Sequence, residues 1–370
     1  MRKVAVLFGG RSCENEISIL TGVFACNLLS GGYDVLPVYV GVDGGMYTAP
    51  KMRDIDTFRK GDFSGFERIF FDGGTAYAFV SKKRKIKTIG KVDVALNCCH
   101  GGWGEGGGVS AMMEANQIPL ASPDVTPSAL FMDKYLTKVV MKGLGVPTLD
   151  YIRVNERDYE KRGAFLLKTI EGKLKYPVII KPARLGSSIG ITLARDEEEA
   201  KRGIENAFAL DSRVIVEKFL AEKTDVNCAA YSLNGEIFVS EPEVAFGEGV
   251  YSFEEKYVKR TANGSVGKSN GKGALKGAMR EKIRAYTKSI YKRTDMKGVV
   301  RMDFLVHGNE VYLCEVNTVP GSLAYYLFCE RLTDARGFFS ALLEDAIRQG
   351  NSGKKLITTG ILRTAKISGK

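Results

Sequence analysis

The sequence predicts an α/β chain, with an N-terminal parallel open-sheet domain followed by a domain built on antiparallel strands. In the first third, short apolar runs alternate with segments of helical spacing, which is typical of parallel strands joined by crossover helices. Beyond residue 147 the apolar runs return through hairpins, and Asn234-Gly235 is a strong hairpin-turn signal. A length of 370 residues allows two or three domains.

The N-terminal third supplies the parallel sheet. We expect strands at 4–8, 35–40 and 92–99, and helices at 16–30 and 109–117. Ligands bind at the carboxyl ends of parallel strands. The segments Gly9-Gly10-Arg11 and His100-Gly101-Gly102 follow two such ends and are therefore candidate site loops.

The remaining chain begins with a boundary at 120–150. We expect strands at 176–182, 186–194 and 213–220, hairpins at 226–239 and 299–317, and helices at 128–143 and 196–209. The segment 260–278 is rich in glycine and lysine and predicts a loop that acts as a lid.

Composition excludes several classes of protein. The net charge of +11 comes from dispersed basic residues, which favours a surface that attracts an anionic cofactor over a nucleic-acid-binding surface. Seven cysteines without a CxxC pair and only two histidines argue for reduced thiols rather than a zinc site. The first apolar run is too short for a signal peptide and no segment approaches a membrane span, so we expect a cytoplasmic protein.

The hairpin at 299–317 carries polar side chains inside its apolar strands. If its loop spans 308–310, Asp303 lies opposite Glu315, and Asn317 shares the face of Glu315. Oxygen ligands without histidine or thiolate suit Mg²⁺, and Arg301 on the same face would hold an anion. The alternative is a salt-linked face turned to solvent, which the apolar flanks make less favourable.

Three glycine-rich segments of the sequence are candidate phosphate-binding sites. Residues 181–190 place a lysine at a strand end before a Gly/Ser turn, an arrangement that can cradle a phosphate or carboxylate. Residues 102–107 match the dinucleotide pattern GxGxxG, but they follow a late strand and put Glu105 where a pyrophosphate would approach. Residues 262–269 are one glycine short of a P-loop and follow no strand, so we reject them.

Eight segments, in order, resemble those of D-alanine–D-alanine ligases, which are members of the ATP-grasp superfamily. They are VAVLFGGRSCENEIS (4–18), HGGWGEGG (100–107), FMDKYLTK (131–138), YPVIIKPARLGSSIGI (176–191), VIVEKFL (214–220), FEEKY (253–257), RMDF (301–304) and EVNTVPG (315–321). The resemblance covers residues 3 to about 345, and PGSLAYYL (320–327) also resembles the D-alanine–D-serine branch of vancomycin-resistance ligases.

The resemblance implies a two-lobed ATP-grasp domain after the N-terminal domain. The implied divisions are 1–127, a small lobe at 128–220, and a C-terminal lobe at 221–370 with a lid at 250–278. The implied activity phosphorylates D-alanine with ATP, attacks the acyl phosphate with a second D-amino acid, and serves peptidoglycan synthesis. It implies two Mg²⁺ ions, with Mn²⁺ as an alternative, small-molecule substrates, a homodimer, and neither a nucleic-acid nor a membrane partner.

The resemblance also implies roles for individual residues. The positions that match catalytic residues are Glu14, Ser187, Tyr257, Arg301 and Gly321, the last two at the oxyanion. The positions that match substrate-binding residues are His100, Lys256, Ser322 and Leu323. Those that match ATP-binding residues are Lys134, Lys181, Glu217, Lys218, Leu220 and Asp225, and those that match metal ligands are Asp303, Glu315 and Asn317.

The chain departs from the family pattern around the acceptor site and the lid. Gly106 and Ser110 stand where the family usually has an acidic residue and a glutamine, and Glu255 replaces an alanine. Either Ser322-Leu323 or Tyr326-Leu327 would line the acceptor site. Three alternatives therefore stay open: D-alanine as acceptor, D-serine or another small amino acid as acceptor, and a non-catalytic ATP-binding relative.

Overall fold

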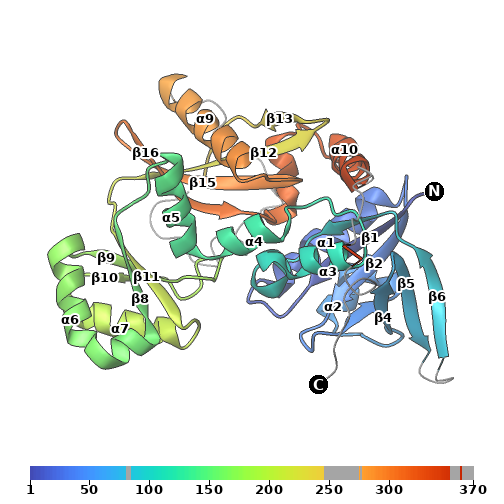
Figure 1. The fold of residues 1–370 in the computed structure, drawn as a ribbon, viewed down its shortest axis with the longest axis horizontal. Helices are drawn as coiled ribbons and strands as arrows, with labels where there is room; N and C mark the ends of the chain where they lie inside the picture. Colours follow the sequence, from blue (N-terminus) through green and yellow to red (C-terminus); the bar gives the residue numbers. More distant parts are fainter. Residues whose placement is uncertain (81–84, 246–274, 276, 351–358, 361–370) are drawn as a thin grey trace.

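A computed structural model of the protein describes residues 1–80, 85–245, 275, 277–350 and 359–360. The described residues form three sheets, each covered by helices (Figure 1). Their sequence order matches the predicted order, with a sheet containing parallel strands first and antiparallel sheets after it.

The first sheet has the strand order β6-β5-β4-β3-β2-β1-β7. Its strands are β1 (Lys3–Gly9), β2 (Asp34–Val40), β3 (Met46–Thr48), β4 (Glu67–Asp72), β5 (Thr75–Val80), β6 (Lys85–Lys91) and β7 (Val94–Asn97). Only β2, β1 and β7 pair in parallel, and β3 to β6 add an antiparallel meander that the sequence analysis missed. The strand expected at 92–99 ends at Asn97, whose side chain accepts the Cys99 N–H at 2.9 Å and turns the chain into the next loop.

Helix α1 (Asn15–Leu29) packs on β1, and the late helix α10 (Leu332–Gly350) packs on α1 and β7. The other helices of this region are η1 (Pro50–Arg53), α2 (Ile55–Arg59), η3 (Gly104–Gly108) and α3 (Val109–Ala115). One apolar core joins Val6, Cys26, Leu323 and Phe339, so the start of the chain is packed against its C-terminal third. This shared core fixes the site loops of the first sheet relative to the segment that follows residue 317.

The second sheet has the order β10-β9-β11-β8 and is covered by α6 (Glu156–Leu174) and α7 (Glu197–Phe208) (Figure 1). Its strands are β8 (Tyr151–Asn155), β9 (Val178–Pro182), β10 (Thr192–Ala194) and β11 (Arg213–Lys218). The strand expected at 186–194 is wrong before Thr192, because Ser187, Ser188 and Gly190 have positive φ angles that break an extended chain.

Two helices rather than one lead into this sheet. The helix expected at 128–143 is divided into α4 (Val125–Met132) and α5 (Lys134–Leu144). Asp133 separates them with an extended backbone (φ −100°, ψ 111°) and caps α5, accepting from the Tyr135 and Leu136 N–H groups. A capping aspartate of this kind satisfies amides that the new helix leaves free.

The third sheet has the order β13-β12-β15-β16, with β14 (Glu243–Val244) paired to β12. Its other strands are β12 (Thr224–Leu233), β13 (Glu236–Val239), β15 (Val299–His307) and β16 (Glu310–Asn317). Helix α9 (Gly277–Arg293) covers one face, and the predicted turn at Asn234-Gly235 is confirmed. A 3₁₀ segment, η4 (Gly321–Leu327), follows β16.

Across the ranges that the structure describes, no helix combines the length and the apolar character needed to traverse a bilayer. All seven cysteines are free thiols, and Cys13 alone is exposed, as the absence of a CxxC pair predicted.

Candidate active site

The β15–β16 hairpin brings the predicted polar residues together. Asp303 pairs with Glu315 as predicted, although the connecting loop has two residues rather than three. A β-bulge at Cys314 inserts the extra residue that restores this register, since Phe304 pairs with Leu313 on the other side of it. The two carboxylates therefore share the sheet face opposite to the one that carries the buried core residues of β15.

Asp303 is the centre of this polar face. Its carboxylate accepts from Arg301 through Nε at 2.7 Å and Nη2 at 2.8 Å, and from Asn317 Nδ2 at 3.1 Å. Within the described ranges no three histidine, cysteine, aspartate or glutamate side chains converge on a metal-sized site. The set here is two carboxylates and an amide, whose hard oxygens are the donors that Mg²⁺ prefers, so the residues fit such an ion.

The facing surface of the second sheet carries a buried charged cluster. Glu217 accepts from Lys138 at 2.7 Å and from Lys181 at 2.5 Å, and the Glu217 side chain is only 3% exposed. Burial alone would raise the pKa of Glu217, but the two ammonium groups lower it to about 2. Burial would likewise lower the pKa of Lys181, yet the acidic groups around its ammonium, Glu217 among them, raise it. Because burial raises the pKa of the Cys314 thiol and keeps it neutral, Glu217 supplies the negative charge.

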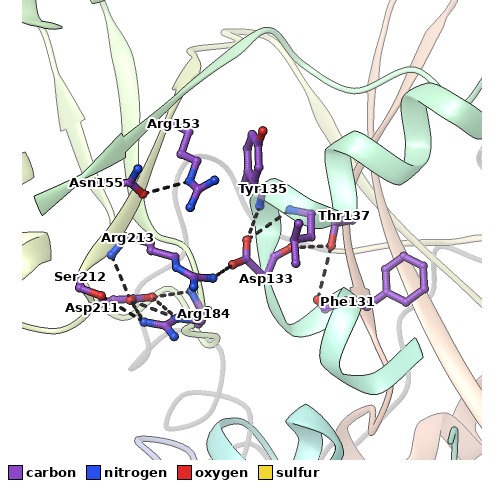
Figure 2. A network of polar contacts seen from close by, with 11 residues as sticks. Phe131, Asp133, Tyr135, Thr137, Arg153, Asn155, Arg184, Asp211, Ser212 and Arg213 are labelled. Atoms are coloured by element: carbon purple, nitrogen blue, oxygen red, sulfur yellow. Dashed lines mark hydrogen bonds and ion pairs between the residues drawn. The ribbon is translucent and has the colours of Figure 1, made fainter. Parts of the chain in front are cut away.

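Helix α5 carries Lys138 of this cluster and also Lys134, and hydrogen bonds at its start hold it in place. Figure 2 shows Asp133 capping the helix and receiving Arg213 Nη1 at 2.8 Å from β11, beside the Arg184–Asp211 ion pair. The capped helix starts at Lys134, whose backbone N–H donates to Ala183 O at 2.9 Å. The cap therefore sets the position of Lys134, and of Lys138 one turn later.

The second and third sheets approach each other at these cations, and we refer to the region bounded by Lys134, Lys181 and Glu315 as the cleft. Lys134 Nζ donates to Leu185 O at 2.5 Å and lies 3.8 Å from Glu315 Oε2. Lys181 Nζ lies 4.0 Å from Cys314 Sγ. Lysines from α5 and β9 thus face the carboxylates of β15 and β16, an arrangement suited to a phosphorylated ligand between the sheets.

Three further predicted residues belong to the segment from the end of β11 to the start of β12. Lys218 is exposed and its N–H donates to Asp150 O at 3.0 Å, and Leu220 follows the end of β11. Asp225 lies on β12 and forms an ion pair with Lys223. The chain between β11 and β12 therefore connects the second sheet to the third.

A second group of residues joins the first domain to the Gly/Ser turn. The Ser187 hydroxyl donates to Glu14 Oε1, so the predicted link between these residues is present. A Cβ added to either Gly101 or Gly186 would lie 2.6 Å from Glu14 Oε2 and would displace this carboxylate, and Gly101 also has a positive φ of 64°. Glu14 is thereby enclosed by loops from two domains.

His100 is buried and bonded on both ring nitrogens. Nε2 lies 2.9 Å from Thr21 Oγ1 and Nδ1 lies 2.7 Å from Val319 O, so Nδ1 carries the proton that bonds the carbonyl. Burial lowers the pKa of His100 to about 4, which leaves the ring neutral at pH 7. Thr21 also accepts the Ser322 N–H at 3.3 Å, and it thus connects His100 to η4. Thr21 was missed by sequence reasoning because its partners lie far away in the chain.

Glu105 forms a second link that the sequence analysis missed. Its carboxylate accepts the Gly101 N–H at 2.8 Å and the Val319 N–H at 3.1 Å. The group that a dinucleotide pyrophosphate would approach is therefore committed to protein amides, which argues against the GxGxxG alternative. Glu105 clamps the loop after β7 to the segment after β16.

Glu105 allows a pH test of this clamp. Its pKa is raised from 4.5 to about 7, chiefly by burial and then by Glu14. A raised carboxyl pKa contributes stability that is complete below the unfolded value and is lost as the pH rises through the folded value. We expect the ligand-free wild type to lose about 2 kcal/mol of unfolding free energy between pH 4.5 and 7 relative to Glu105→Gln. Urea unfolding of both proteins at several pH values measures this difference in unfolding free energy. If the two proteins show the same dependence on pH, the raised pKa of Glu105 is contradicted.

The start of η4 has an unusual backbone. Ser322, Leu323 and Ala324 have φ angles of 50°, 52° and 49°, a left-handed stretch without glycine. Such strain is held in place by the surroundings and clusters at functional sites. Leu323 is buried in the core shared with the first domain, whereas the Tyr326 hydroxyl lies 3.4 Å from Arg301 Nη1. The segment therefore presents Ser322 toward Thr21 and Tyr326 toward the cleft, and Gly321 precedes both.

Two predicted site residues, Lys256 and Tyr257, lie outside the described residues, as does Glu255. Nearly all of the lid expected at 250–278 falls there too.

Two family profiles match the chain. The profile described as "D-ala D-ala ligase N-terminus" matches residues 3–123, and "D-ala D-ala ligase C-terminus" matches residues 140–348. A D-alanine–D-alanine ligase of Caldicellulosiruptor bescii is 32% identical over 352 residues, covering 93% of this chain and 94% of that protein. One from Thermosipho africanus is 31% identical over 335 residues, covering 89% and 88%.

Solved structures of two ligases are also similar to this chain. The D-alanine–D-alanine ligase of Helicobacter pylori is similar with a TM-score of 0.76 and 27% identity, covering 94% of this chain and 99% of that one. The VanG D-Ala:D-Ser ligase of Enterococcus faecalis is similar with a TM-score of 0.73 and 26% identity over the same shares.

Proposed function

The chain belongs to the D-alanine–D-alanine ligase family, and from this premise we propose that it joins D-alanine to a second D-amino acid while converting ATP to ADP and phosphate. The observation that supports this most strongly is the approach of two lysines to β16: Lys134 Nζ lies 3.8 Å from Glu315 Oε2 and Lys181 Nζ lies 4.0 Å from Cys314 Sγ, and Glu315 pairs with Asp303. The product would be a D-alanyl dipeptide for peptidoglycan synthesis, made in the cytoplasm where ATP is available.

ATP would lie between the second and third sheets. We assign its phosphates to Lys134 and Lys181, whose ammonium groups line the cleft. Glu217, Lys218 and Leu220 would meet the adenine, and Asp225 the ribose. The two lysines that keep Glu217 ionised fix its carboxylate as a hydrogen-bond acceptor, which suits an amino group such as that of adenine.

Asp303, Glu315 and Asn317 would hold the divalent metal, as two Mg²⁺ ions with Mn²⁺ as an alternative. When bound, the metal neutralises charge on the transferring phosphoryl group. Asp303 is already aligned for this role by two hydrogen bonds from Arg301.

The remaining residues position the amino acids. Glu14, held by Ser187, would orient the first amino acid together with neutral His100, and we propose that Tyr257 also links to Glu14. The carboxylate of the first amino acid would attack the γ-phosphate of ATP and release ADP. The amine of the second amino acid would then attack the acyl phosphate and release phosphate. Arg301 and the Gly321 amide would stabilise the oxyanion.

Water must be kept from the acyl phosphate until the second amine attacks it. We assign this exclusion to the lid at 250–278, with Lys256 reaching the γ-phosphate and the substrate.

We propose three functional divisions: the N-terminal domain at 1–127, the small lobe at 128–220 and the C-terminal lobe at 221–370. We also propose a homodimer, which light scattering of the purified protein tests directly.

The acceptor is the least constrained part of this proposal. We expect D-alanine to be the preferred second substrate. We propose that the Ser322-Leu323 segment meets it through Ser322, because the Ser322 N–H bonds to Thr21 beside His100, while the Leu323 side chain packs in the core. A panel of D-alanine, D-serine and other small amino acids, read by mass spectrometry, measures the product ratio. A dominant D-alanyl-D-serine product would instead support the alternative that the likeness to VanG suggests. ATP binding by calorimetry without any dipeptide would indicate a non-catalytic relative.

A further inference from the structure

A second cavity lies in the first domain, at the opposite end of its sheet from the active site. It has a volume of about 620 Å³ and is lined by the first residues of β1 and β2 together with η1 and parts of β4 and β6. Lys3 and Asp34 stand at the amino ends of these strands, whereas the loops of the active site follow their carboxyl ends. The cavity is therefore separate from the cleft that we assign to ATP.

Arg53 is the group in this cavity whose bonding is incomplete. Its Nη2 donates to Val35 O at 2.9 Å, but its Nε is buried and has no acceptor. Among the described residues Arg53 forms no ion pair with a carboxylate, although half-buried guanidinium groups usually have such a partner. The Asn27 side chain donates to Arg53 O at 2.8 Å and fixes η1 on α1. The backbone of Arg53 is therefore held in place beside the cavity.

The remaining lining combines an apolar floor with a charged rim. The floor is made of the buried residues Val35, Leu36, Pro37 and Ala49. At the rim, Lys3 is neutralised by Asp34, while Lys87 and Glu67 are exposed. The unneutralised charge nearest the floor is thus the Arg53 guanidinium, in a pocket that otherwise favours apolar surface.

We propose that this cavity binds a small amphipathic organic anion. Its carboxylate or phosphate would accept from Arg53, and its apolar part would cover Val35, Pro37 and Ala49. Planar guanidinium groups recognise either headgroup, so both belong to the expected chemistry.

Calorimetry with simple probes tests this proposal. Benzoate and phenyl phosphate supply the two headgroups on one apolar body, acetate lacks the body, and benzamide lacks the charge. With ADP and magnesium saturating the catalytic cleft, we expect benzoate or phenyl phosphate to bind and benzamide to give no heat. The stronger of the two anions identifies the headgroup, and acetate should bind more weakly than benzoate.

Variants locate the binding. Arg53→Met keeps the apolar stem and should weaken binding about tenfold or more. The matched control Arg68→Met removes an exposed arginine of β4 that does not line the cavity, and it should leave binding unchanged. Equal affinity in both variants, or equal binding of benzamide, would overturn the proposal. If Arg53→Met does not fold, wild-type crystals soaked in benzoate decide: density against Arg53 supports the site, and density only elsewhere refutes it.

Discussion

Replacing Glu315 with glutamine should lower the turnover of D-alanine and ATP by about 10²-fold or more. The substitution keeps the size of the side chain but removes the negative charge that faces Asp303 and lies 3.8 Å from Lys134 Nζ. If this carboxylate holds a divalent metal against the transferring phosphoryl group, its negative charge stabilises the transition state more than it stabilises the enzyme–substrate complex. Removing the charge should therefore lower kcat. The release of ADP under saturating substrates measures the effect on kcat.

A matched control lies on the same strand. Glu310→Gln makes the same change at an exposed position at the start of β16, where the carboxylate accepts from the Tyr312 hydroxyl, and turnover should remain near that of the wild type. Both variants should melt close to the wild type, since neither carboxylate is deeply buried. Near-normal turnover of Glu315→Gln would remove Glu315 from the site.

Replacing Glu217 with leucine should lower the free energy of unfolding by about 3–5 kcal/mol. The change leaves Lys138 and Lys181 without their shared counter-charge at positions where the side chains are 2% and 11% exposed. Removing one partner of a buried ion pair costs far more than the pair contributes, because the remaining charge stays desolvated. Urea unfolding of the ligand-free protein measures the loss.

The double variant Lys138→Met/Glu217→Leu separates charge from packing. It also removes the charge of Lys138, one of the two lysines that lose their counter-charge, and should therefore be more stable than Glu217→Leu alone. If the losses of the two single variants simply add in the double variant, the effect comes from packing and not from charge. Glu171→Leu, a change at an exposed position of α6, serves as the surface control and should cost less than about 0.5 kcal/mol. A loss below about 1 kcal/mol in Glu217→Leu would contradict the buried-triad account.

In the β15–β16 hairpin, the sequence could predict which polar side chains share a face and which residues pair. Alternation along a strand places Glu315 and Asn317 on one face whatever the neighbours are. The pairing of Asp303 with Glu315 was predicted from a three-residue loop, and it is correct because a shorter loop and a bulge at Cys314 compensate each other. Neither the loop length nor the bulge has a clear local signal in this sequence, so the correct register rested on two cancelling errors.

The contacts that join domains could not be predicted from local pattern. His100 meets Val319 across 219 residues and Glu105 meets the same segment across 214. Such contacts follow from the packing of α1 and α10 into one core, which no periodicity describes. Of the missed meander strands, β6 is mostly exposed and carries no apolar run, whereas β4 and β5 carry short apolar runs that the sequence analysis did not assign.

The central claim is the coupling of ATP cleavage to peptide-bond formation, and one measurement tests it most directly. Purified protein is incubated with ATP, magnesium and D-alanine, and ADP and D-alanyl-D-alanine are quantified in the same samples. The account predicts equal amounts of ADP and dipeptide at every time point, and neither product when D-alanine is omitted. ADP release without dipeptide, or no turnover with D-alanine or any other pair of D-amino acids, would contradict it.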